Sequence, residues 1–268
     1  MPELPEVEVT KRIIKPYIFG YTILYTKIYN INLRWPISNE LISIKNQIVI
    51  DVIRRAKYIL LELTNGFIII HLGMSGKLEV LHKNIRPGKH DHIDFVMNNN
   101  VIIRYNDSRK FGSLIWSHKY HLPKNILNLG VEPLSNDLNY NWFCNNIRNK
   151  NSLIKPLLMS TKWIVGIGNI YANEILFASK IMPTRIIRTL DDNEVKVLIY
   201  NIKKILLYAI NLGGSTINNF SCNQFTGMFS KKLQVYGRYN SKCNKCMNMI
   251  KTIRMNNRST FFCDICQK

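Results

Sequence analysis

The first residues of the chain could carry out covalent chemistry. Pro2 follows Met1, a context in which the initiator is normally removed, and removal would expose a secondary amine beside the carboxylate of Glu3. An α-amino group titrates near pH ~8, well below a lysine amine. The amine would therefore be partly unprotonated at neutral pH and able to form a Schiff base, with Glu3 moving protons. The alternative is that these residues only begin a helix.

Two cysteine pairs near the C-terminus have the spacing of a zinc site. They are Cys243-x-x-Cys246 and, after sixteen residues, Cys263-x-x-Cys266. Each pair can bind one side of a tetrahedral zinc ion, and four protein ligands leave no open position for catalysis. We therefore expect one structural zinc ion; the alternative is two reduced, unligated pairs. The intervening residues predict a hairpin with Arg254 and Arg258 at or near its tip, where an arginine can contact phosphate.

Two further segments suggest phosphate binding, although each has a plainer explanation. Gly166 and Gly168 precede a helix that begins near Asn169, and a helix N-terminus is a favourable site for phosphate. The cationic segment Arg54–Tyr58 could be an exposed strand edge protected by charge. If Pro2 forms a Schiff base, Lys57 could instead serve phosphate binding or proton transfer.

Large apolar residues in two glycine-bounded loops suggest a wedge for DNA. Met74 lies in residues 73–76, and Phe111 follows Arg109 in residues 107–112. Inserted apolar side chains unstack base steps, and enzymes that act on a base extrude it from the duplex. Arg109 could then hydrogen-bond the orphaned partner base. The alternative for both apolar residues is ordinary packing.

His90 and His92 could form a metal pair, because alternating residues of a strand share a face. The sequence offers no evident third ligand. We therefore favour a phosphate-contacting or structural histidine over a metal site. Cys144 and Cys222 stand alone, and we assign no role to Cys222.

Composition favours a polyanionic partner. The 268 residues contain 37 Lys and Arg against 17 Asp and Glu, a formal net charge of +20, which points first to nucleic acid and second to an anionic membrane. No apolar run approaches the ~20 residues of a membrane span. The N-terminus lacks the apolar region of a secretion signal. We expect a cytoplasmic protein, nucleoid-associated in a bacterium.

Periodicity divides the chain into a β-rich first part and a helical second part. A helix is predicted over 3–19. Strands are predicted over 22–30, 48–53, 58–63, 67–72, 93–97 and 101–105. Helices are predicted over about 136–148, 152–160, 169–180 and 191–212, and residues 215–230 predict a loop.

The fold class expected is α+β. It comprises an N-terminal β-sandwich with a leading helix over residues 1–130, a helical domain over 131–230 and a zinc finger over 231–268.

Taken together, these segments resemble a bacterial formamidopyrimidine-DNA glycosylase, the base-excision repair enzyme for oxidised purines. The resemblance runs end to end and rests on the order and spacing of its markers. These are Pro2–Glu8, Arg54–Tyr58, His71–Gly76, Lys89–His92, Asp107–Gly112, Val165–Ala172, Leu233–Arg238 and the terminal cysteine pairs.

The resemblance implies roles for individual residues. Pro2 matches the nucleophile, Glu3 the acid–base residue, Lys57 the proton donor for β-elimination and Arg258 the finger arginine of δ-elimination. Asn169 matches the phosphate-binding residue of a helix–two-turn–helix motif. The DNA-contacting positions are matched by His90, Arg109 and Lys150, and the trio that fills the void of an extruded nucleotide by Met74, Arg109 and Phe111.

The resemblance implies a glycosylase and abasic-site lyase for 8-oxoguanine and formamidopyrimidines in duplex DNA, acting as a monomer with zinc. Ser108 and Lys110 depart from the Pro and Arg that the family often shows, and Asn218 stands where relatives can carry a lysine. Lesion preference is therefore open. Two alternatives remain: an endonuclease VIII-type enzyme for oxidised pyrimidines, and a non-catalytic zinc-finger DNA-binding protein.

Overall fold

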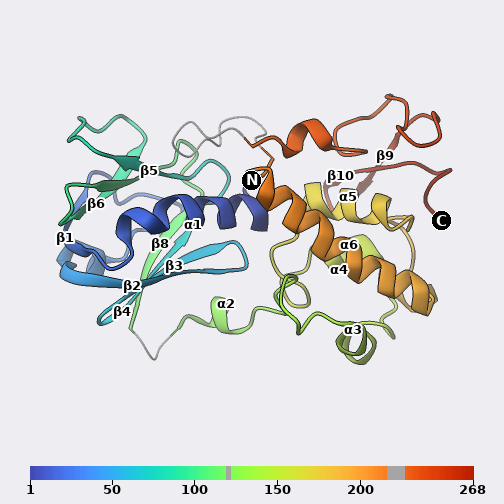
Figure 1. Cartoon of the computed structure of the whole chain (residues 1–268), viewed down its shortest axis with the longest axis horizontal. Helices are drawn as coiled ribbons and strands as arrows, with labels where there is room; N and C mark the ends of the chain where they lie inside the picture. The colour runs from blue at the N-terminus through green and yellow to red at the C-terminus, as the bar shows by residue number, and fades with distance from the viewer. Residues whose placement is uncertain (119–121, 216–226) are drawn as a thin grey trace. The chain divides into compact units, whose positions relative to one another are not determined.

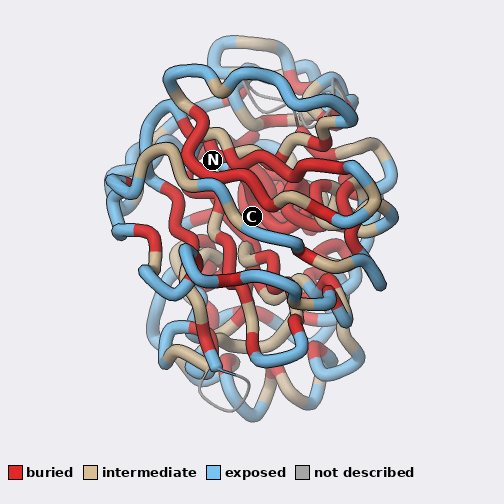
Figure 2. The backbone as a smooth tube through the Cα atoms, turned by 90° about the vertical axis from the view of Figure 1, so that its left-hand side faces the viewer, coloured by how far each residue is buried: buried red, intermediate tan, exposed pale blue. Residues whose placement is uncertain are grey.

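The computed structural model describes residues 1–118, 122–215 and 227–268 (Figure 1). Their contacts define two compact units. The N-terminal unit comprises Met1–Leu127 and Gly213–Met228, and the C-terminal unit comprises Asn128–Leu212 and Phe229–Lys268. Buried segments alternate with exposed loops along the chain (Figure 2). The division into three domains stays a prediction, since the helices and the cysteine-rich end belong to one unit.

The N-terminal unit begins with helix α1 (Leu4–Ile18), within the predicted range. Pro5 lies in its first turn, where the missing N–H has no helical partner to lose. Pro16 lies inside the helix, which ends soon after it. The helix contacts β2, β3 and β5 of the sheet described below. Its buried apolar residues include Leu4, Val7, Ile14 and Ile18.

A sheet of eight strands follows α1 in the described part of this unit, in the order β5-β7-β6-β1-β2-β3-β4-β8. The strands are β1 (Thr22–Ile28), β2 (Lys45–Arg55), β3 (Tyr58–Leu63), β4 (Gly66–His71), β5 (Lys77–Leu81), β6 (Asp91–Met97), β7 (Ile102–Asn106) and β8 (Ser113–His118). All pairings are antiparallel.

The sheet is a β-sandwich, as predicted. Strands β1 and β2 join its two four-stranded halves through a short pairing that starts at Thr22 and Ile48. Both halves contribute to a single hydrophobic core, for example Phe95 and Ile103 from one half and Ile68 from the other. Burial of this core against water is the main favourable contribution to folding of the unit.

Four short elements of this unit were not predicted individually. They are β5, β8, the 3-10 helix η1 (Asn39–Ser43) and helix α2 (Lys124–Leu127). Strand β5 is an edge strand of five residues whose alternation is complete, with Leu78 and Val80 buried. So short an alternating run is hard to separate from a loop by pattern alone.

The C-terminal unit is helical and ends in a hairpin. Its elements are α3 (Tyr140–Asn146), α4 (Ile154–Leu158), α5 (Asn169–Ala178), η2 (Ile187–Thr189), α6 (Asp192–Asn211), η3 (Phe229–Lys232), β9 (Lys251–Met255) and β10 (Arg258–Phe262). The hairpin falls within the residues predicted to form one. The predicted loop 215–230 lies mostly outside the described residues, and its end forms η3.

Local capping sets the boundaries of these helices. Asp191 accepts the N–H of Glu194 at 2.7 Å, and the Glu194 carboxylate accepts the N–H of Asp191 at 2.9 Å, so α6 begins with a capping box. Asn139 caps α3 by accepting the N–H of Trp142, so α3 starts later than predicted. In the described ranges, no helix is both long and apolar enough to span a membrane.

Candidate functional site

Pro2 and Glu3 lie at the start of α1 in a buried setting. Glu3 is the N-terminal cap of the helix, and its backbone N–H donates to Oε2 of Glu6 at 2.8 Å. Pro2 is buried, and Glu3 and Glu6 are each 3% exposed. The residue next to Pro2 is therefore held by a buried carboxylate, which restricts where the N-terminus can point.

Glu6 binds a second segment through its other oxygen. Oε1 accepts the backbone N–H of Ser215 at 2.7 Å and its hydroxyl at 2.9 Å. Gly214 has φ +81°, a conformation that favours glycine, and a Cβ atom there would lie 2.9 Å from this oxygen and displace the Glu6 carboxylate. Glu6 was not singled out from the sequence. Its position in the sequence could have indicated this role, because a glutamate at the third helical position can accept the backbone N–H of the cap residue.

Lys57 lies in the tight turn between β2 and β3. Arg55 pairs with Tyr58, so Ala56 and Lys57 form the turn, with φ +52° at Ala56. Tyr58 in turn pairs with His71 on β4. Burial, and to a smaller extent the positive charge of Lys57, lower the pKa of His71 to about 4. Lys57 and His71 are therefore electrostatic neighbours at one end of these strands.

Arg54 links helix α1 to the turn between β2 and β3. Its Nε donates to Oε2 of Glu8 on α1 at 3.0 Å, and its Nη1 donates to the carbonyl of Ala56 at 3.0 Å. Strand β2 pairs with β3 from Val49 to Arg55, and with β1 only from Lys45 to Ile48. The interpretation of this segment as a charged strand edge stays a prediction.

The two predicted wedge loops pack against each other. Gly73 has φ +61°, and a Cβ atom there would lie 2.4 to 2.6 Å from backbone atoms of Phe111 and Gly112. The side chains of Met74 and Phe111 nevertheless stay 39% and 38% exposed. The Arg109 guanidinium lies 4.8 Å from the Phe111 ring centroid. The structure thus brings Met74, Arg109 and Phe111 onto adjacent loops with apolar surface open to a ligand.

His90 and His92 have different environments. The carbonyl of His90, which is half-buried, accepts the N–H of Asp107 at 2.9 Å. His92 is fully buried, and its Nε2 lies 2.9 Å from the Asp107 carbonyl. Among the residues described, only the four C-terminal cysteines form a group that could hold a metal ion. His92 is a structural histidine, as the sequence favoured.

Asn169 opens helix α5 of the C-terminal unit and contacts the hairpin. Its Nδ2 donates to the carbonyl of Ser259 at 3.0 Å. One turn later, Oδ1 of Asn173 accepts the N–H of Phe261 at 2.8 Å. Lys155, which is 1% exposed, donates from Nζ to Oγ1 of Thr260 at 2.6 Å. Helices α4 and α5 therefore hold strand β10 in place.

Arg258 is exposed at the first position of β10. It pairs with Met255, so Asn256 and Asn257 form a two-residue turn in which both φ values are positive, 46° and 59°. Asparagine tolerates this left-handed conformation better than most residues. The hairpin therefore presents Arg258 at a short tip. Arg258 lies near Asn169 of the same unit, because Asn169 binds the carbonyl of the next residue, Ser259.

Lys150 lies just after α3, with its ammonium above an aromatic ring. Its Nζ is 4.0 Å from the ring centroid of Trp163, and Lys162 lies 5.1 Å from the same centroid. A cation above an indole face is held by the ring quadrupole. Trp163 thereby restricts the reach of the predicted DNA-contacting lysine.

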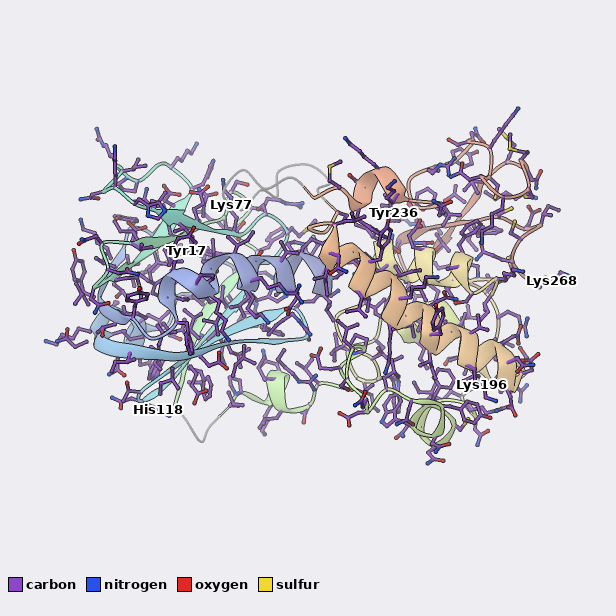
Figure 3. All side chains as sticks on the ribbon, in the orientation of Figure 1. Tyr17, Lys77, His118, Lys196, Tyr236 and Lys268 are labelled. Atoms are coloured by element: carbon purple, nitrogen blue, oxygen red, sulfur yellow. The ribbon has the colours of Figure 1, made fainter. Side chains whose placement is uncertain are left out.

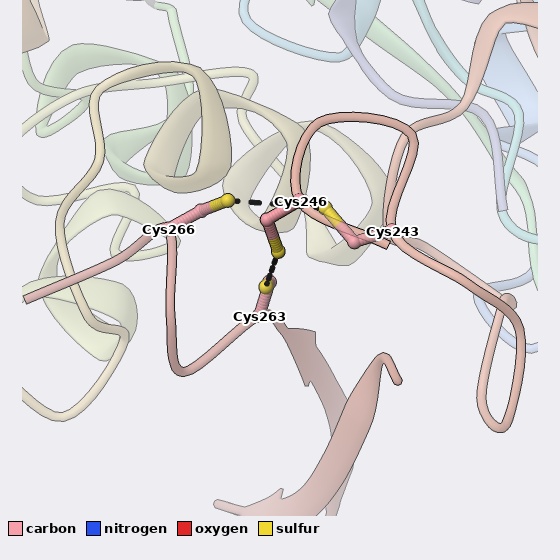
Figure 4. Close-up of side chains that lie close together, drawn as sticks. All are labelled: Cys243, Cys246, Cys263 and Cys266. Carbon is pink, nitrogen blue, oxygen red and sulfur yellow. Dashed lines mark hydrogen bonds between the residues drawn. The ribbon is translucent and has the colours of Figure 1, made fainter. Parts of the chain in front are cut away.

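The four cysteines fit a zinc ion. Their sulfur atoms all lie within 4.8 Å of one another, with 3.9 Å between Cys243 and Cys266 and 3.4 Å between Cys246 and Cys263 (Figure 4). Tetrahedral zinc with sulfur at ~2.3 Å requires separations of this size. The four-thiolate donor set selects zinc, and its closed coordination makes the site structural.

Glu174 is a second buried carboxylate that the sequence did not reveal. It accepts three backbone N–H groups, from Gln234 at 2.8 Å, Val235 at 3.0 Å and Tyr236 at 2.9 Å. Burial raises the pKa of this carboxyl, against the opposing effect of the three donors. The segment around Tyr236, labelled in Figure 3, is thus tied to α5. Its partners lie about 60 residues away, so no local pattern points to them.

Comparisons with known proteins identify this combination of β-sandwich, helices and zinc-finger hairpin. Residues 1–114 match the formamidopyrimidine-DNA glycosylase N-terminal domain, and residues 129–221 match its H2TH domain. Residues 240–268 match the zinc finger found in FPG and IleRS. These matches define a zinc-finger glycosylase class.

Individual relatives match the chain over its whole length. The formamidopyrimidine-DNA glycosylase of Baumannia cicadellinicola subsp. Homalodisca coagulata is 48% identical over 268 residues, 100% of both chains. A complex of wild-type Lactococcus lactis Fpg (MutM) with N7-benzyl-Fapy-dG DNA has a TM-score of 0.91 at 31% identity, and one of the same protein with oxidised-pyrimidine DNA has 0.90 at 31%, each covering 100% of both chains. The chain belongs to the formamidopyrimidine-DNA glycosylase family.

Proposed function

We propose that this protein is a bifunctional DNA glycosylase and abasic-site lyase that removes oxidised purines from duplex DNA in base excision repair. One observation carries the proposal. Pro2 and Glu3 stand at the buried start of α1, fixed through Glu6, in a chain that matches formamidopyrimidine-DNA glycosylases from end to end. The Lactococcus relative bound to Fapy-dG DNA supports the purine substrate.

The chemistry begins at the N-terminus once Met1 is removed. The Pro2 nitrogen attacks the sugar anomeric carbon, and the bond to the damaged base breaks as the base leaves. Glu3 moves the proton needed for opening of the sugar ring. The resulting iminium acidifies the neighbouring sugar carbon, so the 3′ phosphate and then the 5′ phosphate are eliminated. Lys57 donates a proton in the elimination of the 3′ phosphate (β-elimination). Arg258 is the finger arginine that assists the elimination of the 5′ phosphate (δ-elimination).

The remaining predicted residues bind DNA in this proposal. His90, Lys150 and Asn169 contact phosphates, which positions the duplex without reading its sequence. Met74, Arg109 and Phe111 fill the void that the extruded nucleotide leaves. Cys243, Cys246, Cys263 and Cys266 would hold the zinc ion, and its binding would fix the hairpin that carries Arg258. The three functional segments are residues 1–130, 131–230 and 231–268, and the protein acts as a monomer in the bacterial cytoplasm, associated with the nucleoid.

A second candidate is excision of oxidised pyrimidines by the same chemistry. The Lactococcus relative was also captured with DNA that contains an oxidised pyrimidine. Cleavage rates of matched duplexes with 8-oxoguanine or an oxidised pyrimidine separate the two substrates. We expect faster cleavage of the purine lesion; the reverse order would assign the protein to the pyrimidine class.

Borohydride trapping tests the mechanism itself. Intact-mass measurement first establishes that Met1 is absent from the purified protein. The unaltered protein should then cut 8-oxoguanine duplexes and form a covalent adduct with abasic DNA under borohydride. A double variant Pro2→Gly and Glu3→Gln should do neither while still binding DNA. Binding without an adduct by the unaltered protein would leave only a non-catalytic zinc-finger DNA-binding protein.

A further inference from the structure

Asp107 is a fully buried carboxylate at the base of the two wedge loops, residues 73–76 and 107–112. Its Oδ1 accepts the hydroxyl of Ser75 at 2.5 Å and the N–H of Arg109 at 3.2 Å. Its Oδ2 accepts the N–H of Gly112 at 2.8 Å and the hydroxyl of Tyr105 at 3.2 Å. The donors are thus two hydroxyls and two backbone N–H groups.

The backbone of Asp107 ties a third segment to the same point. Its N–H donates to the carbonyl of His90, and its carbonyl lies 2.9 Å from Nε2 of His92. A single residue therefore joins the start of β6, the loop after β4 and the loop after β7. A buried carboxylate whose hydrogen bonds are all in place rigidifies its surroundings, because leaving any donor unpaired in a low dielectric is costly.

The groups that bind the Asp107 carboxylate are the immediate neighbours of the wedge side chains. Ser75 follows Met74 in the chain, and Gly112 follows Phe111. Arg109 binds Asp107 through its own backbone, and its N–H also lies 3.0 Å from the Ser75 hydroxyl. The exposed ends of Met74, Arg109 and Phe111 therefore project from a backbone that one buried side chain organises.

We propose that Asp107 is a positioning residue that holds both wedge loops in the geometry needed to enter the duplex and to read the orphaned base. The inference rests on the proposed function, because it assumes that Met74, Arg109 and Phe111 enter DNA. Preorganised loops lose little further freedom on insertion, so the binding energy is not consumed in ordering them. Without the Asp107 acceptor, Arg109 would discriminate less between a cytosine and an adenine opposite the lesion.

Two variants and one matched control test the inference. Asp107→Asn replaces one acceptor oxygen by a donor, which then faces an N–H or hydroxyl that already donates. Ser75→Ala removes only the hydroxyl that joins the loops, so the inference stays testable if the first variant does not fold. The control is Asp94→Asn, the same change at a buried carboxylate of the same sandwich, where Asp94 pairs with Arg104.

The readouts are excision rates from 8-oxoguanine duplexes with cytosine or adenine opposite, and 2-aminopurine fluorescence beside the lesion to report insertion. We expect Asp107→Asn to lower the cytosine-to-adenine rate ratio about tenfold, the effect of losing one hydrogen bond to a charged group. Ser75→Ala should lower it less, and both should weaken the fluorescence change. Asp94→Asn should leave the ratio unaltered even if its melting temperature falls.

The inference would be overturned if both test variants excised 8-oxoguanine more slowly by the same factor opposite cytosine and opposite adenine, with a normal fluorescence change. Asp107 would then be a merely structural residue. The proposed function fails in a different way. In that case the unaltered protein would leave every lesion duplex uncut and would form no borohydride adduct with abasic DNA. The two failures are therefore told apart by the unaltered protein alone.

Discussion

Buried carboxylates organise this protein at the scale of single residues. Glu6 and Asp107 in the N-terminal unit and Glu174 in the C-terminal unit each accept hydrogen bonds from backbone N–H groups. Each joins segments that are distant in sequence or belong to different loops. A carboxylate is suited to this task because its two oxygens can accept several donors at once.

Removal of the Glu174 charge tests this account. Glu174→Gln places an amide donor near the N–H groups of Gln234, Val235 and Tyr236, and at least one of them loses its acceptor. We expect a loss of about 1–3 kcal/mol in the free energy of unfolding of the C-terminal unit. Urea titration measures it. Asp137→Asn, at an exposed carboxylate of the same unit, is the control, and equal stability of the two variants would contradict the prediction.

His71 makes stability depend on pH. Gly73 donates its N–H to Nδ1 of His71 at 3.1 Å, a bond that only a ring unprotonated at Nδ1 can accept. Burial and the Lys57 charge lower the pKa of His71 to about 4, whereas an unfolded histidine titrates near ~6.5. Between these values the unfolded chain binds the additional proton, so the unfolding free energy should fall as pH decreases, by on the order of 2–3 kcal/mol.

Urea unfolding at pH 5 to 7, compared with His71→Gln, checks this prediction for His71. The variant cannot take up the proton and should show a shallower pH dependence over this range. Histidine proton resonances give a second measurement, in which the His71 signal should stay at its neutral position down to about pH 5. Identical pH profiles for the two proteins would show that His71 is not buried as a neutral ring.

At the scale of elements, the sequence predicted the helices and strands that local patterns define, but it did not predict the contacts between distant residues. The helical period over 3–19 and the strand patterns over 22–30 and 58–63 are local signals, and the structure confirms a helix and two strands there. The cysteine spacing likewise identified the metal site. The contacts of Glu6 with Ser215, of Lys155 with Thr260 and of Glu174 with residues 234–236 were not predicted, because these partners are 60 to 209 residues away, where sequence periodicity carries no information.

The candidate site shows the same limit. The glycine-bounded loops at Met74 and Phe111 were recognisable from composition, but their direct backbone packing at Gly73 was not. The sequence likewise did not predict the ion pair between Arg54 and Glu8, whose charged atoms lie 3.0 Å apart, because the two residues are 46 positions apart in the chain. A cation in a sequence does not reveal which face of a strand its neighbours will cover.

The zinc-finger hairpin, β9 and β10, should depend on its metal as a unit. Cys246→Ser removes one of four ligands, and structural zinc contributes folding free energy directly. We expect loss of the zinc ion, unfolding of residues 240–268 and at least about a tenfold loss of DNA affinity, as Arg258 loses its fixed position. The N-terminal unit should keep its own thermal transition. Metal analysis and calorimetry measure both effects, and Cys144→Ser, a cysteine outside the cluster, should retain one zinc per chain.

At the scale of the whole molecule, the net charge of +20 predicts that DNA binding weakens as salt concentration rises. Each phosphate that a cation neutralises releases counterions, so the logarithm of affinity should fall linearly with the logarithm of salt concentration. The alternative is that the excess of lysine reflects only an AT-rich coding sequence and serves no DNA contact. In that case DNA binding would be weak, and loss of one particular lysine would not change the slope of log affinity against log salt concentration.

Lys150 separates these two possibilities. Its ammonium is held at 4.0 Å from the Trp163 ring centroid, so it presents its charge from a fixed place. Lys150→Gln should reduce the magnitude of the salt slope by about 0.9, the amount expected for one phosphate contact. Lys83→Gln, at an exposed lysine without a predicted DNA contact, should leave the slope unchanged. Fluorescence anisotropy with an abasic-analogue duplex over a range of salt concentrations gives both slopes, and equal slopes for the two variants would mean that Lys150 neutralises no phosphate.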